Sequence, residues 1–117
     1  MPLVASAQEG CQSPRGNINC AQWGDELRCD IQARSYTPPS PREACALDYG
    51  NAVGLTSGGP RMLCSGNTIA NPRHPVLPYG TAWQGKGVTC KSLPNGVRCI
   101  NAAGRGFELA RARLGFS

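Results

Sequence analysis

The stretch from Ile18 to Ile31 constrains the fold most, because two alternating runs flank the dipeptide Gly24-Asp25. Gly-Asp is typical of the two-residue turn of a β-hairpin, in which glycine takes positive φ at the first central position. A turn there places Cys20 opposite Cys29 at a non-hydrogen-bonded pair, where facing Cα atoms approach to about 4.5 Å. That separation suits a disulfide. The sequence therefore predicts a hairpin closed by a Cys20–Cys29 disulfide.

The same register sorts the hairpin side chains onto two faces. The disulfide face carries Ile18, Cys20, Leu27, Cys29 and Ile31, and the opposite face carries Asn19, Glu26, Arg28 and Asp30. Ile18 faces Ile31, and Gln22 faces Leu27. Trp23 belongs to the face opposite the disulfide, so we expect it to be either exposed or covered by another layer.

Cysteine usage indicates a disulfide framework. The chain has 117 residues, of which 40% are hydrophobic and only 6% aromatic, with 15 Gly, 10 Pro and seven Cys. Such a chain has many turns and a thin core, and each disulfide adds about 2–4 kcal/mol to its stability. Zinc sites favour close pairs of ligands, whereas Cys20 and Cys29 are nine residues apart, as are Cys90 and Cys99. Disulfides are therefore favoured over zinc, and they indicate a secreted or periplasmic protein.

The remaining pairings are less constrained by geometry. We expect Cys45–Cys64 and Cys90–Cys99, although six cysteines allow about fifteen pairings. Cys11 is left over, and three alternatives stay open: a free thiol, a disulfide-linked homodimer, or displacement of one expected pair.

A second hairpin is predicted around the four-residue loop 93–96, with strands at 87–90 and 97–100. Each predicted hairpin has an arginine directly before its second cysteine, Arg28 in the first and Arg98 in the second. If Cys90 faces Cys99, Lys91 faces Arg98, and this like-charge pair indicates an exposed face. A three-residue loop would shift the register by one.

The other predicted elements complete a mainly β, disulfide-stapled antiparallel barrel or sandwich with one or two short helices. Residues 11–16 form an entry loop. Ser40, Pro41 and Glu43 are typical of a helix start, which predicts a helix from Pro41 to about Leu47. Shorter signals predict strands at 52–55, 61–64, 81–83 and 107–109, and a final short helix at 110–114. Residues 11–117 are expected to form a single domain.

The N-terminus also favours export. Ala5-Ser6-Ala7 has the small-x-small form of a signal-peptidase site, although the basic and long apolar regions of a signal peptide are absent. We interpret residues 1–10 as a signal-peptide remnant or a flexible tail. No apolar run reaches the length of a transmembrane helix.

Several motifs together resemble a family of small exported bacterial proteins classed as a domain of unknown function. The matching pieces include Ser13-Pro14-Arg15-Gly16-Asn17-Ile18-Asn19-Cys20, Leu77-Pro78-Tyr79-Gly80, Trp83 and Gly104-Arg105-Gly106-Phe107. The resemblance implies six framework cysteines, at positions 20, 29, 45, 64, 90 and 99. It also implies that Cys11 replaces a usual aromatic residue and that Arg105 replaces a usual histidine. It implies no activity.

The net charge of +5 is concentrated in the last third of the chain. Residues 1–83 hold six basic and six acidic groups, whereas residues 84–117 hold six basic groups against Glu108 alone. The predicted basic binding residues are Lys86, Lys91, Arg98, Arg105, Arg111 and Arg113. Trp23, Tyr79 and Trp83 are the aromatic candidates, because such rings stack on sugars or anchor interfaces. For Tyr79 and Trp83, core packing is the favoured alternative.

These observations predict a non-catalytic envelope or extracellular binding module. Its expected partner is an anionic glycan, a membrane surface or an acidic protein, and nucleic acid is not favoured. One alternative is a secreted enzyme inhibitor that presents the loop at 71–80. Another is a small hydrolase using His74, although a lone loop histidine is more often a surface residue. No cofactor motif is present, and we expect neither cofactor nor metal.

Overall fold

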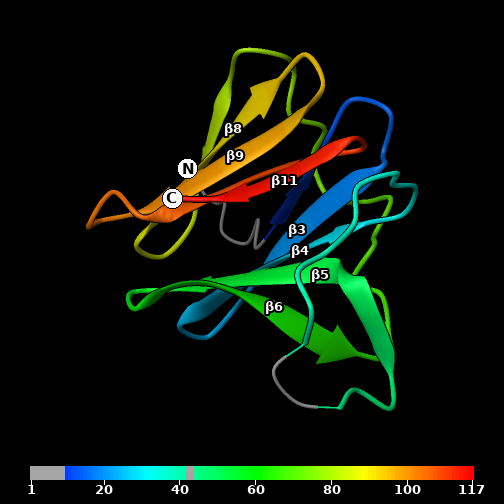
Figure 1. The fold of residues 1–117 in the computed structure, drawn as a ribbon. Helices are drawn as coiled ribbons and strands as arrows, with labels where there is room; N and C mark the ends of the chain where they lie inside the picture. Colours follow the sequence, from blue (N-terminus) through cyan, green and yellow to red (C-terminus); the bar gives the residue numbers. More distant parts are fainter. Residues whose placement is uncertain (1–9, 42–43) are drawn as a thin grey trace.

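The structure is a computed structural model, and it describes residues 10–41 and 44–117. Two five-stranded antiparallel sheets pack face to face as a sandwich (Figure 1). The N-terminal sheet contains β2 (Gly10–Gln12), β3 (Ile18–Trp23), β4 (Glu26–Ile31), β5 (Asp48–Thr56) and β6 (Gly59–Ser65). The C-terminal sheet contains β7 (Ala82–Gln84), β8 (Val88–Leu93), β9 (Gly96–Asn101), β10 (Gly106–Ala110) and β11 (Arg113–Phe116). Every strand pairs with its neighbours in sequence, so each sheet is a meander.

The first hairpin forms as the turn chemistry predicts. Gly24 has a φ of 59°, and Ile18 faces Ile31 while Cys20 faces Cys29. The Cys20–Cys29 disulfide joins Cα atoms 4.0 Å apart. The predicted register of this hairpin is confirmed.

The second hairpin repeats this arrangement with a tighter turn than predicted. Cys90 faces Cys99 and is bonded to it, again with Cα atoms 4.0 Å apart. The strands extend to Leu93 and Gly96, so the connection is the two-residue turn 94–95 and not a four-residue loop. The direct register of Lys91 with Arg98 is confirmed.

The two disulfides meet at the centre of the sandwich. Cys29 Sγ lies 3.9 Å from Cys99 Sγ, and the sulfur atoms of Cys20, Cys29, Cys90 and Cys99 all lie within 4.8 Å of one another. Buried aliphatic and aromatic side chains surround them, among them Leu27, Leu55, Val97, Phe107 and Leu109. The core is therefore a small apolar layer with four sulfur atoms at its middle.

The helix expected at 41–47 is wrong for the residues that can be judged. Residues 44–47 are not helical, and residues 42–43 lie outside the described part of the chain. A helix this short is marginal in water unless it packs against a core. Here Cys45 is instead tied to Cys64 on β6 by the third disulfide, and Tyr49 donates a hydrogen bond to Pro39 O.

The final helix expected at 110–114 is also wrong, because that segment contains a turn and β11. Arg113 pairs with Ala110 and Leu114 with Leu109, so β10 and β11 form an antiparallel hairpin. Pairing to the sheet edge overrides the helical preference of the local sequence. The entry loop proved to contain β2, and the strands predicted at 52–55, 61–64 and 81–83 lie within or beside β5, β6 and β7.

Helices are absent from the described residues, so none there is long and apolar enough to span a membrane. The interpretation of residues 1–10 as a signal remnant or tail falls almost wholly on residues 1–9, outside the described chain.

Candidate functional site

Four connections converge at one end of the sandwich, and their backbone conformations are set locally. In the turn before β3, Gly16 donates its N–H to Ser13 O at 2.8 Å, and Ser13 Oγ accepts the N–H of Ile18 at 3.0 Å. In the segment before β7, Thr81 N–H bonds to Pro78 O, and Gly80 has a φ of 83°. Such a turn needs glycine because a side chain there is strained.

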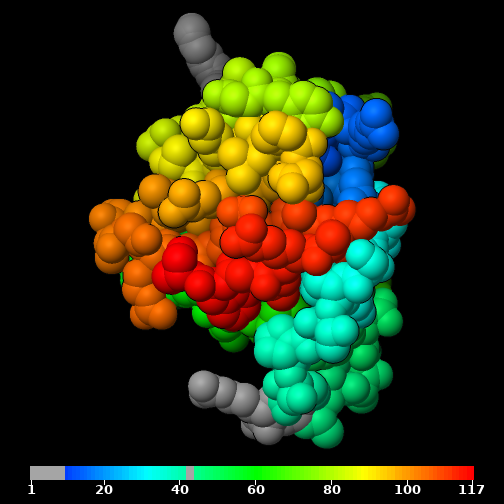
Figure 2. Space-filling model, turned by 45° about the horizontal axis from the view of Figure 1, so that its top comes forward, coloured from blue at the N-terminus to red at the C-terminus, as the bar shows by residue number. Residues whose placement is uncertain are grey.

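These connections enclose a groove of about 530 Å³, which we call the end groove. Its polar and aromatic lining comes from the turn before β3, the segment before β7 and the turns after β8 and β10: Arg15, Asn17, Tyr79, Asn95 and Arg111. Its apolar lining includes Pro14, Ile18, Leu93 and Pro94. In Figure 2 the red-orange turn after β10 lies between the blue turn before β3 and the cyan segment that follows β4.

The cationic groups of the end groove have no partners in the described part of the chain. Within the described residues, the guanidinium groups of Arg15 and Arg111 and the hydroxyl group of Tyr79 have no hydrogen-bond or ion-pair partner. Among residues 10–41 and 44–117, no Asp or Glu lines this groove. Asn17, by contrast, is occupied, because it donates to Ala33 O and accepts the Ala33 N–H. The end groove therefore presents two available positive charges beside an exposed aromatic ring.

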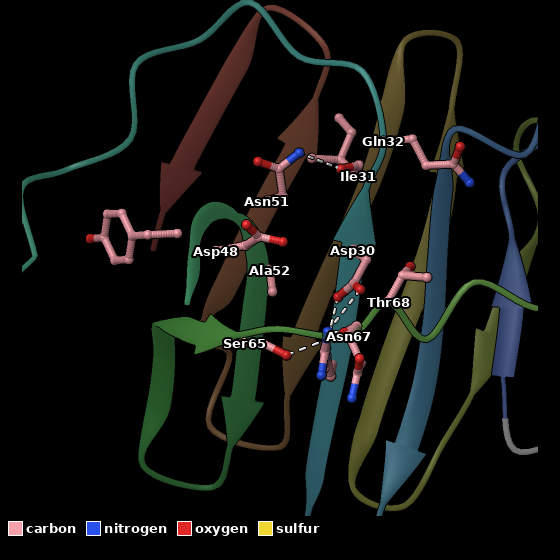
Figure 3. A pocket seen from close by; sticks show the side chains of 11 residues that line it. Asp30, Ile31, Gln32, Asp48, Asn51, Ala52, Ser65, Asn67 and Thr68 are labelled. Atoms are coloured by element: carbon pink, nitrogen blue, oxygen red, sulfur yellow. Dashed lines mark hydrogen bonds and ion pairs between the residues drawn. The ribbon is translucent and has the colours of Figure 1, made fainter. Parts of the chain in front are cut away.

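A second groove, the side groove, lies over β4 and β5 beside residues 65–68 and has a volume of about 540 Å³. Two of its charged residues, Arg28 and Asp30, are already paired. Asp30 accepts hydrogen bonds of 2.8 and 2.9 Å from Arg28 and one of 3.1 Å from the N–H of Ile69. Figure 3 shows Asp30, Ser65 and Asn67 close together on one wall, with Asp48 above Ala52. Arg28 also donates to Asn67 O. The side groove is held together by its own polar groups, and Asp48 is its remaining charge.

The six predicted basic residues are not gathered in one patch. Lys91 and Arg98 lie side by side on the outer face of the C-terminal sheet, and Arg111 lines the end groove. Lys86 pairs with Asp25 at 2.8 Å, near the opposite end of the sandwich, and this contact raises the pKa of Lys86 and lowers that of Asp25. Arg105 donates to Gly58 O, and Arg113 lies 3.9 Å from Glu108.

The aromatic candidates also separate. Trp23 is 64% exposed at the hairpin tip, and Tyr79 is 53% exposed beside the end groove. Trp83 is 9% exposed and belongs to the core. Core packing thus describes Trp83 and not Tyr79, and only Tyr79 lines a groove with cations.

Cys11 is unpaired and buried beside the first disulfide. It faces Cys20 across β2 and β3, and burial raises the pKa of its thiol to about 12. A thiol with so high a pKa is a poor nucleophile at neutral pH. Burial also keeps Cys11 from a second chain in this fold. The four central sulfur atoms are paired in two disulfides. Because zinc binds thiolates, these sulfur atoms do not offer zinc ligands while they are oxidised.

His74 lines neither groove. Its Nδ1 lies 2.5 Å from Asn19 Oδ1, and its main-chain oxygen accepts a hydrogen bond from Gln12. The segment around it is bonded to β2 through Pro75 O and the Leu77 N–H. Residues 71–77 thus lie against the N-terminal sheet, and the contacts of His74 are those of a packing residue.

Comparison with protein families shows that the model of a family of unknown function (DUF6636) matches residues 2–116. The chain belongs to this family. Searches of the curated proteins and of the solved structures found no match to this chain. The prediction of a family of unknown function is confirmed, and membership in DUF6636 assigns no activity.

The sequence reasoning missed Arg15 and Asn95 as groove residues. Both occupy turns, and turn composition predicts the backbone conformation without predicting which turns lie together. The available signal was that turns 13–17 and 94–95 border the two stapled hairpins. The two hairpins pack tip to base, so the tip of the second at 94–95 lies beside the base of the first at 13–17.

Proposed function

We propose that the protein is an exported, non-catalytic binding module whose end groove receives an anionic group of its ligand. The ligand class is an anionic envelope polymer or an acidic partner. Three disulfides in a chain of this size support export, because disulfides persist in oxidising compartments.

One observation carries the proposal: two guanidinium groups without partners among the described residues line the same groove as an exposed tyrosine. Guanidinium groups bind carboxylate and phosphate through paired, charge-assisted hydrogen bonds. The side groove makes the contrast, because its arginine is already bonded to Asp30. The described lining of the end groove has no acidic residue, so its formal charges attract an anion.

The experiment is a binding titration of polygalacturonate, polyglutamate and polyphosphate at low and physiological ionic strength. The double variant Arg15→Gln/Arg111→Gln should weaken binding of the preferred polymer by about tenfold or more for each charge lost. Binding to exposed cations should also weaken as salt is raised.

The matched control is Lys86→Gln/Arg105→Gln, which removes the same charge from the opposite end of the sandwich. It should bind like the unmodified protein. Equal losses in both double variants would show that net charge, and not the end groove, drives binding. Absence of binding to every polymer at low ionic strength would refute the proposed function.

A further inference from the structure

The outer face of the C-terminal sheet is open and positively charged. Lys91 on β8, Arg98 on β9 and Glu108 on β10 form one row across the sheet, and Arg113 lies on β11 beside it. Lys91, Arg98 and Arg113 are all exposed. In Figure 2 the yellow to red residues of this sheet form the surface. Blue and cyan segments of the N-terminal half lie at its edge and do not cover its middle.

This face is continuous with the end groove. Gly96 lines the groove, and Arg98 lies two residues further along β9, a distance of about 7 Å in an extended strand. Arg113 pairs with Ala110, the residue directly before Arg111. The cations therefore extend from Arg15 and Arg111 in the groove to Arg98, Arg113 and Lys91 on the sheet.

Only part of the positive charge in this row is compensated within it, because Glu108 faces Arg98 from β10 while Lys91 faces it from β8. Lys91 directly faces Arg98, and like charges in this position destabilise a sheet. Glu108 is the acidic residue on this face, and its ion pair is the 3.9 Å contact with Arg113. A bound polyanion would supply the missing negative charge along the row.

The lining of the groove suits a sugar better than a nucleic acid. Tyr79 offers one exposed ring, and Asn95 and two guanidinium groups line the same groove with hydrogen-bonding groups. A pyranose places its apolar face on such a ring while its carboxylate bonds to arginine. Single-stranded nucleic acid needs successive aromatic platforms. Strands β8–β11 place Thr89, Lys91, Arg98 and Glu108 on this face, and no aromatic residue.

We propose that the ligand is a linear, carboxylate-bearing polysaccharide. One acidic sugar occupies the end groove, and the following sugars cross the sheet over Arg98 and Lys91. This inference rests on the proposed function, because it identifies the ligand of the same groove and extends the site beyond it.

The test measures affinity for galacturonate oligomers of two lengths, a dimer and an octamer, by calorimetry at low ionic strength. The octamer should bind at least about tenfold more tightly than the dimer, since it alone reaches the sheet. Lys91→Gln/Arg98→Gln should reduce octamer affinity to near that of the dimer and leave dimer affinity unchanged. Arg15→Gln/Arg111→Gln should weaken both, and the control Lys86→Gln/Arg105→Gln neither.

The outcomes separate the two proposals. Equal affinity for dimer and octamer, or no effect of Lys91→Gln/Arg98→Gln, would overturn the extended site and leave the groove intact. Tighter binding of octaglutamate or of a single-stranded oligonucleotide of matched charge would overturn the polysaccharide assignment. If no probe binds, the proposed function itself fails. Unchanged circular dichroism of each variant ensures that lost binding is not lost folding.

Discussion

The central rows of paired residues correspond position by position in the two sheets, yet the outer faces of the sheets differ. The central row of the N-terminal sheet is Cys11, Cys20, Cys29, Val53 and Met62, and that of the C-terminal sheet is Trp83, Cys90, Cys99, Phe107 and Phe116. In each row a disulfide joins the second and third positions, and the two disulfides stack. The inner faces are therefore two versions of one arrangement.

The outer faces differ because of one residue and one distant segment. Arg28 has Asp30 two residues later on the same face, whereas Arg98 has Ile100. Asp30 and Asn19 also bind the main chain of residues 69 and 71, which covers the N-terminal sheet. The same Cys-and-Arg pattern thus gives a structural outer face in one sheet and an open, charged one in the other. Among the described residues, Arg28 is bonded to Asp30, whereas Arg98 has no hydrogen-bond or ion-pair partner. This difference distinguishes the outer face of the C-terminal sheet as the one available for binding.

The largest effect should come from removing either central disulfide. Cys20→Ala/Cys29→Ala and Cys90→Ala/Cys99→Ala open loops of equal separation, nine residues each, and each should lower the free energy of unfolding by about 2–4 kcal/mol. Urea unfolding of both double variants measures this. Similar losses would support the equivalence of the inner faces, while a large loss in one variant alone would refute it.

The outer faces should respond unequally to loss of an acid. Asp30→Ala leaves Arg28 and the Ile69 N–H without their partner in a largely buried site, and it should cost about 2–4 kcal/mol of unfolding free energy. Glu108→Ala removes the contact with exposed Arg113 and the acid that faces exposed Arg98, and it should cost less than about 0.5 kcal/mol. Comparable losses in urea unfolding would contradict the contrast between a covered and an open face.

Cys11 makes the stability of the N-terminal sheet depend on pH in the alkaline range. Trp83, which has no titratable group, occupies the corresponding position in the C-terminal sheet. Burial raises the pKa of the Cys11 thiol from 9.0 to about 12, so the unfolded chain ionises first. This contribution to stability is complete below pH 9 and is lost between pH 9 and about 12. At pH 10 the loss is about 1.4 kcal/mol. Unfolding measured at pH 8 and pH 10 should show this decrease, and Cys11→Ala should lack it.

Local chemistry predicted the hairpins, and long-range packing decided the rest. Gly24-Asp25 defines its turn and register from adjacent residues alone, so the first disulfide follows directly from the sequence. The tip of the second hairpin was harder, because Pro94-Asn95 resembles part of a longer loop. Residues 110–114 have helical composition, but residues 113–116 pair with the free edge of β10 and form β11. No local signal indicates such an edge.

The candidate site was predictable only in part, for the same reason. Tyr79 and Arg111 were identified by residue type, but Arg15 joins them through packing of turns almost a hundred residues apart in the chain. The predicted basic face assumed that sequence neighbours share a surface. The register of β8 with β9 instead keeps Lys91 and Arg98 together, whereas Lys86 and Arg105 lie in the connections before β8 and before β10, at the opposite end of the sandwich.

The smallest effect should come from Lys91, and it separates stability from binding. Lys91→Gln removes a repulsion opposite Arg98, and Lys91→Glu replaces it with an attraction, so unfolding free energy should rise in that order, by about 0.5 kcal/mol or less. Affinity for the octagalacturonate should fall in the same order, since each change removes positive charge from the row. Opposite trends in the two measurements are what an open binding face requires. If Lys91→Glu instead destabilises the protein, Lys91 has a structural partner, and this sheet is not the uncompensated half of the pair.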